Sequence, residues 1–186
     1  MYSLAKLKDY ELIKELTLSL IKYFQFVFRN KSTFVSLKDE VGHTTNYLKI
    51  QELRYLNQFS YTIIVPTYLE DTRIPPLLIL TFVENAVKHA VSLDEEIQIN
   101  VEVKIIEKKD APPFLNINIV DTGVGFSEEL LTKLNSHQTI VNEQGEHTGI
   151  WNIDRRLTLL YDGHAYLEFR NNQPSGAIVE VFIPLS

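Results

Sequence analysis

The chain has 186 residues, of which 45% are hydrophobic and 23% are charged, and its formal net charge is −6. This composition is typical of one globular domain with an appendage. The acidic balance argues against a general nucleic-acid-binding surface, which usually carries a basic patch. Cysteine is absent, which excludes disulfides and thiolate metal sites and fits a reducing compartment such as the cytoplasm.

Two observations bear on membrane contact. The most apolar run, residues 74–83, is half the roughly 20 residues that a membrane-spanning helix needs, and charged residues follow it at once. The first residues also lack the apolar core of a signal peptide. We therefore predict that this segment itself makes no membrane contact.

The N-terminal third is predicted to be helical. Apolar residues recur at helical spacing over residues 9–28, and a second helix over about 37–56 begins at Ser36, with Glu40 completing a Ser-x-x-x-Glu start. The two helices form an antiparallel pair or the remnant of a bundle. We expect residues 1–56 to be a helical stalk, part of a dimerisation region.

After residue 57 the pattern changes to strands that alternate with helices. Strands are predicted at 60–65, 97–106, 114–120, 165–169 and 178–183, and helices at 76–90 and 149–161. The predicted fold class is α+β: a two-layer α/β sandwich with a mixed sheet covered on one face by helices, preceded by the helical pair. Residues 57–186 would form this second domain.

One connection is unusually long. Residues 121–148 have weak periodicity; they begin with Asp-Thr-Gly-Val-Gly at 121–125, and Gly-Glu-His-Thr-Gly at 145–149 closes them. Loops of this length in compact domains are usually functional lids or disordered segments. We predict a lid at about 123–148, hinged at its glycines, and a flexible insertion without function is the alternative.

The most informative segment is Glu-Asn-Ala-Val-Lys-His at residues 84–89. On a helix these polar groups lie within two turns of one another, and they suit a metal-bound polyphosphate: an amide oxygen for Mg²⁺, a cation for phosphate and a carboxylate for proton or water. The alternative is an ordinary solvated helix face with an i,i+4 ion pair. The apolar residues 74–83 that precede it favour a buried, functional helix.

Six motifs follow one another along the chain: Tyr-Leu-Lys-Ile at 47–50, Arg-Tyr at 54–55, Ile-Pro-Pro at 74–76, the segment 84–89, Asp-Thr-Gly-Val-Gly at 121–125, and Gly-Ile-Trp-Asn at 149–152 followed by Arg156-Leu157. In this order they resemble the ATPase fold shared by DNA gyrase, cytosolic chaperones, sensor histidine kinases and mismatch-repair ATPases, and within it the LytS/YesM-type sensor histidine kinases. The resemblance covers residues from about 35 to the end.

The resemblance implies an ATP-binding domain that uses Mg²⁺, with a role for each motif residue. Asn85 would coordinate Mg²⁺, and Glu84 would be the catalytic residue that polarises the attacking group. Asp121 would accept a hydrogen bond from the adenine amino group. The remaining expected ATP contacts are Lys88, His89, Gly123, Gly125, Thr148, Gly149 and Ile150, the last two through backbone amides at a helix N-terminus.

The chain departs from this family in three places. His147 stands where the family has glycine, and Ala177 stands where it has threonine. The phosphate-accepting histidine of a Pro-His-Phe-x-x-Asn motif is absent from the chain, so we expect that segment to belong to the parent protein. His43, on the second helix, is the alternative acceptor, although a lone helical histidine is more often a packing or surface residue.

The predicted function is the ATP-binding catalytic portion of a two-component sensor histidine kinase, which donates the γ-phosphoryl group of ATP to a histidine outside this chain. Its expected partners are ATP, the histidine-bearing segment of the parent protein, a downstream response regulator and a second copy of the chain bound through the stalk. Its expected location is the cytoplasm, as the cytoplasmic part of a membrane-anchored sensor. The alternatives are a non-catalytic ATP-sensing or interaction module of the same fold and, less favoured, a protein serine kinase.

Overall fold

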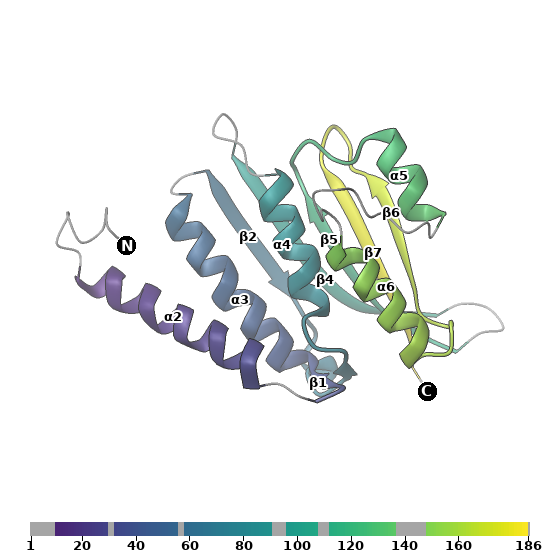
Figure 1. Ribbon diagram of the computed structural model, residues 1–186, viewed down its shortest axis with the longest axis horizontal. Coiled ribbons are helices and arrows are strands. Elements are labelled where there is room, and N and C mark those ends of the chain that lie inside the picture. The colour runs from purple at the N-terminus through teal and green to yellow at the C-terminus, as the bar shows by residue number, and fades with distance from the viewer. Residues whose placement is uncertain are drawn as a thin grey trace.

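The computed structural model describes residues 10–29, 32–55, 58–90, 96–107, 112–136 and 148–185. Figure 1 shows a sheet with α3, α4 and α6 on one face and α2 outermost, next to α3. The elements are α2 (Tyr10–Arg29), β1 (Val35–Ser36), α3 (Leu37–Arg54), β2 (Phe59–Ile64), a 3-10 turn (Thr67–Leu69), β3 (Arg73–Ile74), α4 (Leu78–Ala90), β4 (Ile97–Ile106), β5 (Phe114–Asp121), α5 (Glu128–Asn135), α6 (Thr148–Leu160), β6 (Tyr166–Asn171) and β7 (Ala177–Pro184).

The sheet is mixed, as predicted. Its strand order is β2-β4-β5-β7-β6, with β2 parallel to β4 and the other neighbours antiparallel. The two short strands β1 and β3 form a separate antiparallel pair. The predicted fold class is therefore confirmed, and every strand predicted in the sheet is present to within one or two residues at its ends.

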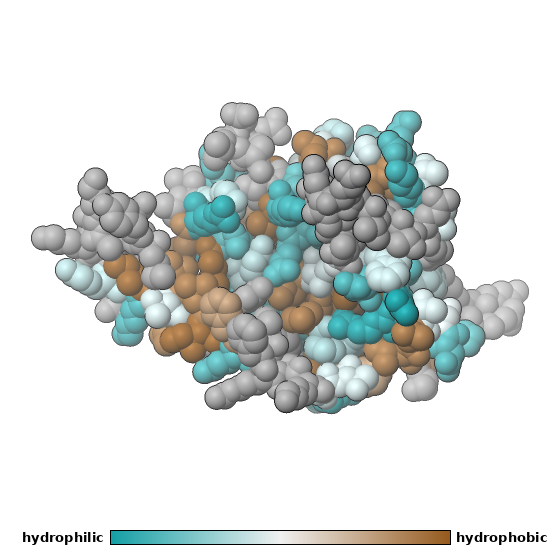
Figure 2. Space-filling model, viewed as in Figure 1, coloured by the Kyte–Doolittle hydropathy of each residue, from teal (hydrophilic) through white to brown (hydrophobic). Residues whose placement is uncertain are grey.

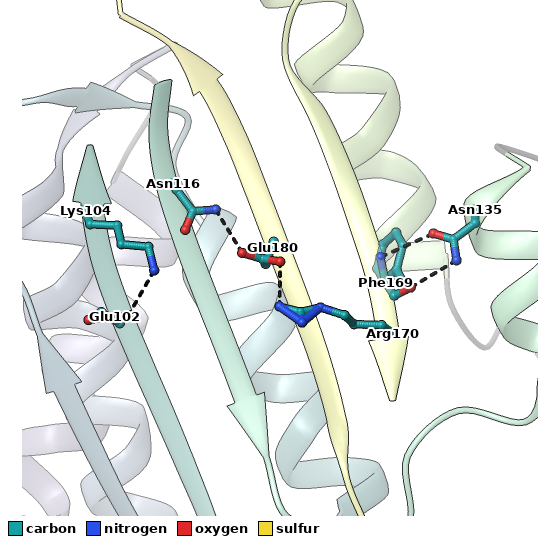
Figure 3. Close-up of polar contacts among 7 residues, drawn as sticks. All are labelled: Glu102, Lys104, Asn116, Asn135, Phe169, Arg170 and Glu180. Carbon is teal, nitrogen blue, oxygen red and sulfur yellow. Dashed lines mark hydrogen bonds and ion pairs between the residues drawn. The ribbon is translucent and has the colours of Figure 1, made fainter. Parts of the chain in front are cut away.

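The sheet buries one face because apolar and polar residues alternate along its strands. In β4 the side chains of Ile97, Ile99, Val101 and Val103 are buried, whereas those of Gln98, Glu102 and Lys104 between them are exposed. The buried set packs beneath the helices in a single core that continues through α4 and α6. Figure 3 shows the opposite face, where Lys104 pairs with Glu102 within β4, and Glu180 on β7 contacts Asn116 on β5 and Arg170 on β6.

The start of α3 agrees with the prediction for Ser36 but not with the prediction that Glu40 completes the same helix start. Ser36 caps the helix as predicted, because its side chain accepts a hydrogen bond from the backbone N–H of Asp39 at 3.1 Å. Glu40 does not turn back to this cap. Its carboxylate instead accepts hydrogen bonds from the backbone N–H groups that precede and begin α4.

The long connection contains a helix that the prediction lacked. α5 begins after Ser127, whose side chain accepts from the N–H of Leu130 at 3.2 Å, and carries acidic residues in its first turn. Its last residue, Asn135, pairs with the backbone of Phe169 on β6 through two hydrogen bonds of 3.0 and 3.3 Å (Figure 3). His147 and residues 137–146 of the predicted lid lie outside the described residues.

The helix α2 presents apolar side chains to solvent. Leu18, Ile21 and Phe24 are each about half exposed, and Figure 2 shows apolar surface over the part of the molecule formed by α2 and α3. Within the described ranges, no helix combines the length and apolar character needed to cross a membrane. The division into a stalk at 1–56 and a domain at 57–186 stays a prediction.

Candidate functional site

A pocket opens between α4, the ends of β5 and β7, the segment that follows β5, and the start of α6. Its volume is about 280 Å³, near the lower end of the roughly 300–1,000 Å³ found for small-molecule sites. It is lined by Phe82, Asn85, Ala86, His89, Ile119, Asp121, Val124, Gly125, Phe126, Leu130, Ile150, Ala177 and Val179. Five of the ten predicted site residues therefore line one cavity, although they are spread over 66 positions of sequence.

Asp121 is the buried carboxylate of this pocket and is only 6% exposed. Its Oδ1 atom accepts the backbone N–H of Gly123 at 2.9 Å and that of Ala177 at 3.1 Å. Among the described residues no donor is recorded for Oδ2. Burial raises the pKa of the Asp121 carboxyl, and the two N–H bonds act in the opposite direction. The side chain is thus held in one orientation with an acceptor left for a ligand.

Two glycines allow the chain to pass close to Asp121. Gly125 and Gly176 have φ angles of 76° and 110°, in the region that favours glycine. A Cβ atom on Gly125 would lie 2.6 Å from the carbonyl oxygen of Gly176, and one on Gly176 would lie 1.9 Å from that of Asp121. The backbone can therefore form this side of the pocket only without side chains at these positions.

The segment leading into α5 is fastened to the edge strand β6. The Asn171 side chain accepts from the N–H of Phe126 at 2.7 Å and donates to its carbonyl oxygen at 2.9 Å. The ring of Phe126 also meets that of Phe169 edge to face, with centroids 6.0 Å apart. These contacts hold Phe126 against the pocket.

Helix α4 supplies the polar residues predicted from its sequence, on two different faces. Asn85 and His89 line the pocket together with Phe82 and Ala86, as i, i+3, i+4 and i+7 spacing requires. Glu84 and Lys88 are not among the lining residues; Glu84 is half-buried and Lys88 is exposed. Their roles stay predictions. The Nδ2 atom of Asn85 is buried, and no residue that the structure describes gives it a hydrogen-bond partner.

Helix α6 brings its first turn to the same cavity. Ile150 lines the pocket and is 5% exposed. Gly149 packs against α4, since a Cβ atom there would lie 3.1 Å from Cγ2 of Thr81. Thr148 begins the helix, so the backbone N–H groups of Thr148, Gly149 and Ile150 belong to the turn that has no acceptors within its own helix.

The apolar wall of the pocket was not predicted. Phe82 and Ala86 could have been inferred from their spacing to Asn85, and Ile119 and Val179 from the alternation of their strands. Val124 lies within the Asp-x-Gly-x-Gly motif, and Phe126 and Leu130 follow it closely in sequence, but only the fold of that segment brings them to the cavity.

The structure disfavours His43 as a phosphate acceptor because its side chain is only 3% exposed, within the helix pair α3 and α4. Burial lowers the pKa of its imidazole to about 4. The folded chain therefore holds His43 neutral at pH values where an unfolded chain protonates it.

A pH-dependent stability follows for His43. As pH falls below about 6.5, the unfolded chain binds a proton that folded His43 does not take up until about pH 4, so its neutral burial costs stability in that window. We expect His43→Gln to remove this loss. Relative to the wild type, the variant should gain on the order of 1 kcal/mol in unfolding free energy between about pH 6.5 and pH 5, measured by urea denaturation.

The exposed His164 provides the matched control, since His164→Gln removes an imidazole from the surface. An equal pH response in the two variants would rule out the burial of His43 as the cause.

The chain matches two family models. One is described as Histidine kinase and matches residues 1–59, and the other is described as Histidine kinase-, DNA gyrase B-, and HSP90-like ATPase and matches residues 71–186. Among curated proteins, the sensor protein LytS of Enterococcus faecalis is 30% identical over 180 residues, which cover 96% of this chain and 30% of that protein. LytS of Oceanobacillus iheyensis is 32% identical, over 89% of this chain and 28% of that protein. The chain thus spans about 30% of the length of such relatives.

Solved structures share the fold at low identity. The catalytic domain of histidine kinase ThkA aligns with a TM-score of 0.56 and 16% identity, over 82% of this chain and 94% of that one. The histidine kinase domain of a blue-light activated histidine kinase from Erythrobacter litoralis aligns with a TM-score of 0.55 and 15% identity, over 97% and 83% respectively. These likenesses concern the fold alone.

Proposed function

Because the chain belongs to the histidine kinase-, DNA gyrase B- and HSP90-like ATPases, we propose that it is the ATP-binding catalytic portion of a two-component sensor histidine kinase. The observation that carries the proposal is Asp121: a buried carboxylate in a largely apolar pocket, with one oxygen fixed by two backbone N–H groups. A carboxylate accepts hydrogen bonds only, so it selects the amino group of adenine over the carbonyl group of guanine.

The apolar walls fit a flat aromatic base. Ile119, Phe126, Ile150 and Val179 line the same pocket as Asp121. Such apolar surfaces can bury the faces of a heterocycle, while Asp121 would form a hydrogen bond with its polar edge. Gly123 holds Asp121 through its N–H, and Gly125 lets the backbone approach.

The phosphate end would lie along α4 and the start of α6. Asn85 offers an amide oxygen for Mg²⁺, and its buried Nδ2 has no hydrogen-bond partner among the described residues, which fits a ligand that completes the side chain's bonding. The described residues contain no group of three or more His, Cys, Asp or Glu side chains that could hold a metal, so Mg²⁺ would take most of its ligands from phosphate and water. When bound, it neutralises phosphate charge.

Roles for the other predicted residues follow from their positions. The N–H groups of Thr148, Gly149 and Ile150 begin α6 and suit phosphate oxygens. His89 lines the pocket, and Lys88, one residue before it, carries a positive charge for the phosphates. Glu84 would polarise the attacking imidazole. The bond between the γ-phosphorus and the oxygen that bridges the β- and γ-phosphates would break as a bond from the γ-phosphorus to a histidine nitrogen of the parent protein forms, and ADP leaves with the bridging oxygen.

We extend the proposal to the parent protein. Its phosphate-accepting histidine lies outside this chain, a response regulator takes the phosphoryl group onward, and the chain forms the cytoplasmic part of a membrane-anchored sensor. The half-exposed Leu18, Ile21 and Phe24 of α2 provide an apolar face for a second copy.

The first test is calorimetric titration of the folded chain with ATP, with and without Mg²⁺. Saturable binding that strengthens with Mg²⁺ supports the proposal, and undetectable binding at millimolar ATP would refute it. Mixing the chain with the histidine-bearing segment of its parent and labelled ATP then tests phosphotransfer. Binding without transfer would favour the non-catalytic alternative, which Ala177 supports because it lines the pocket without a hydroxyl group.

Replacement of Asn85 tests the metal assignment. Asn85→Ala removes the proposed Mg²⁺ ligand, so we expect ATP affinity to become nearly equal with and without Mg²⁺, falling roughly tenfold in its presence. The measurement is the same titration. Asn100→Ala, on the opposite face of the sheet from the helices, is the matched control and should leave the Mg²⁺ dependence unchanged. Full Mg²⁺ dependence in Asn85→Ala would contradict the assignment.

A further inference from the structure

Glu40 is a buried carboxylate outside the pocket. Its side chain is 0% exposed, and it lies on α3, the helix before β2. Oε2 accepts the backbone N–H of Leu77 at 2.8 Å, and Oε1 accepts those of Ile79 at 3.0 Å and Leu80 at 3.2 Å. Three charge-assisted hydrogen bonds to one carboxylate are a strong link between two segments nearly 40 residues apart.

These three N–H groups precede and begin α4. The first N–H groups of a helix have no acceptor within it, and a negative charge there also interacts favourably with the helix dipole. Leu77 adopts a φ of 62°, uncommon for a residue with a side chain, and its N–H bonds to Glu40 in this conformation. The start of α4 is therefore set by a side chain of α3.

Arg156 connects the same point to α6. Its Nη2 atom donates to the carbonyl oxygen of Pro76 at 2.6 Å, next to the Leu77 N–H that Glu40 accepts. Its positive charge lowers the pKa of Glu40, against the larger effect of burial. One junction thus joins α3, α4 and α6, of which the last two line the pocket through Asn85, His89 and Ile150.

We propose that Glu40 is a positioning residue for the nucleotide site, which holds α4 and α6 in register from α3 so that a movement of α3 changes the pocket. This inference rests on the proposed function. Helices move as stiff units, and Asn85 follows Leu80 by little more than one turn. Because α2 packs directly on α3, a shift of α2 would reach the pocket by the same route.

The protonation of Glu40 can be used to test its effect on the nucleotide site. Burial raises its pKa to about 7, while the hydrogen bonds from Leu77, Leu80 and Ile79 and the charge of Arg156 oppose this. The other titratable groups near the junction are Tyr161, the residue that follows α6, whose pKa burial raises, and neutral His43 on α3. Above about pH 7 the carboxylate accepts all three bonds; below it, a proton occupies one oxygen.

Glu40→Gln imitates the protonated state with little change in shape. The amide oxygen can still accept two N–H groups, but the amide nitrogen faces the third donor. Glu52→Gln, an exposed change on the same helix, is the matched control. The experiment measures ATP affinity by calorimetry from about pH 6 to about pH 8, on either side of the Glu40 pKa, and hydrogen exchange of the amides of Leu77, Ile79 and Leu80.

We expect Glu40→Gln to bind ATP roughly tenfold more weakly than the wild type at about pH 8 and equally at about pH 6, with faster exchange at Leu77. Glu52→Gln should match the wild type throughout. A constant affinity ratio across this range would overturn the inference, because the loss would not depend on the charge of Glu40. Equal affinity at every pH would also overturn it, because the cap would then have no effect on the nucleotide site. Wild-type chain that binds no ATP would instead refute the proposed function.

Hydrogen exchange of the wild-type chain also tests the inference, and this measurement does not require that Glu40→Gln folds. The protection of the Leu77, Ile79 and Leu80 amides, corrected for intrinsic exchange rates, should fall from about pH 8 to about pH 6 as Glu40 takes up its proton. The amides of Ala86 and Val87, which lie within α4 beyond its first turn, should not follow it. Unchanged protection at the three amides would also overturn the inference.

Discussion

Asp121→Asn is expected to weaken ATP binding by roughly 10- to 100-fold while the chain stays folded. The amide oxygen of asparagine can still accept the N–H groups of Gly123 and Ala177, which Oδ1 of Asp121 accepts now. The other pocket-facing atom, however, changes from an acceptor to a donor, which opposes the adenine amino group. Calorimetric titration with ATP measures the loss, and urea denaturation checks that stability is retained.

The same variant tests base selectivity. An amide donor suits the carbonyl group of guanine, so the preference for ATP over GTP should shrink in Asp121→Asn. Asp162→Asn is the matched control: Asp162 is exposed, and its φ of 50° suits asparagine well. If Asp121→Asn binds ATP as tightly as the wild type, the adenine contact assigned to Asp121 is wrong.

Gly176→Ala is expected to cost about 3 kcal/mol or more of unfolding free energy and to disrupt the pocket. The new Cβ atom would lie 1.9 Å from the carbonyl oxygen of Asp121 and 2.9 Å from Cα of Thr122, both backbone atoms. Relief requires the β6–β7 connection to move away from β5. That movement breaks the hydrogen bond from the Ala177 N–H to Asp121. Urea denaturation and ATP titration measure the two effects.

Gly163→Ala is the control for Gly176→Ala, because it tests backbone strain without a steric clash of the new Cβ atom. Gly163 has a φ of 78°, also in the glycine region, but nothing lies within 4 Å of a Cβ atom there. We expect that variant to lose only about 1 kcal/mol and to bind ATP normally. Equal losses in the two variants would show that the close approach of Gly176 to Asp121 is not what constrains this position.

The sequence predicted the sheet well because its signals are local. Period-two alternation predicts a strand over residues 97–106, and β4 has these bounds, since over most of its length one face is buried and the other faces solvent. The helix α5 was missed although Ser127, two glutamates and Leu130, Leu131 and Leu134 are helix signals. It is only eight residues long, and flanking glycines and polar residues obscured its pattern.

The sequence predicted only part of the site, because its motifs are local signals and do not show which face of a helix is buried. Asn85, His89, Asp121, Gly125 and Ile150 meet in one pocket, and their motifs predicted the family to which the chain belongs. Yet on α4 the sequence could not distinguish the face of Asn85 and His89 from that of Glu84 and Lys88. Both faces carry polar residues, and the burial of one depends on which strands and loops pack against it.

By itself, then, the sequence determined the fold class, the order of its elements and the motifs of an ATP-binding family, because alternation, helical spacing and glycine-containing turns are properties of neighbouring residues. Only the tertiary structure decided that Asp121 is held by Gly123 and Ala177, that Gly176 must lack a side chain, and that Glu40 caps α4 and not its own helix. Each of these depends on backbone groups brought together from distant segments, and a buried carboxylate takes the N–H donors that packing places beside it.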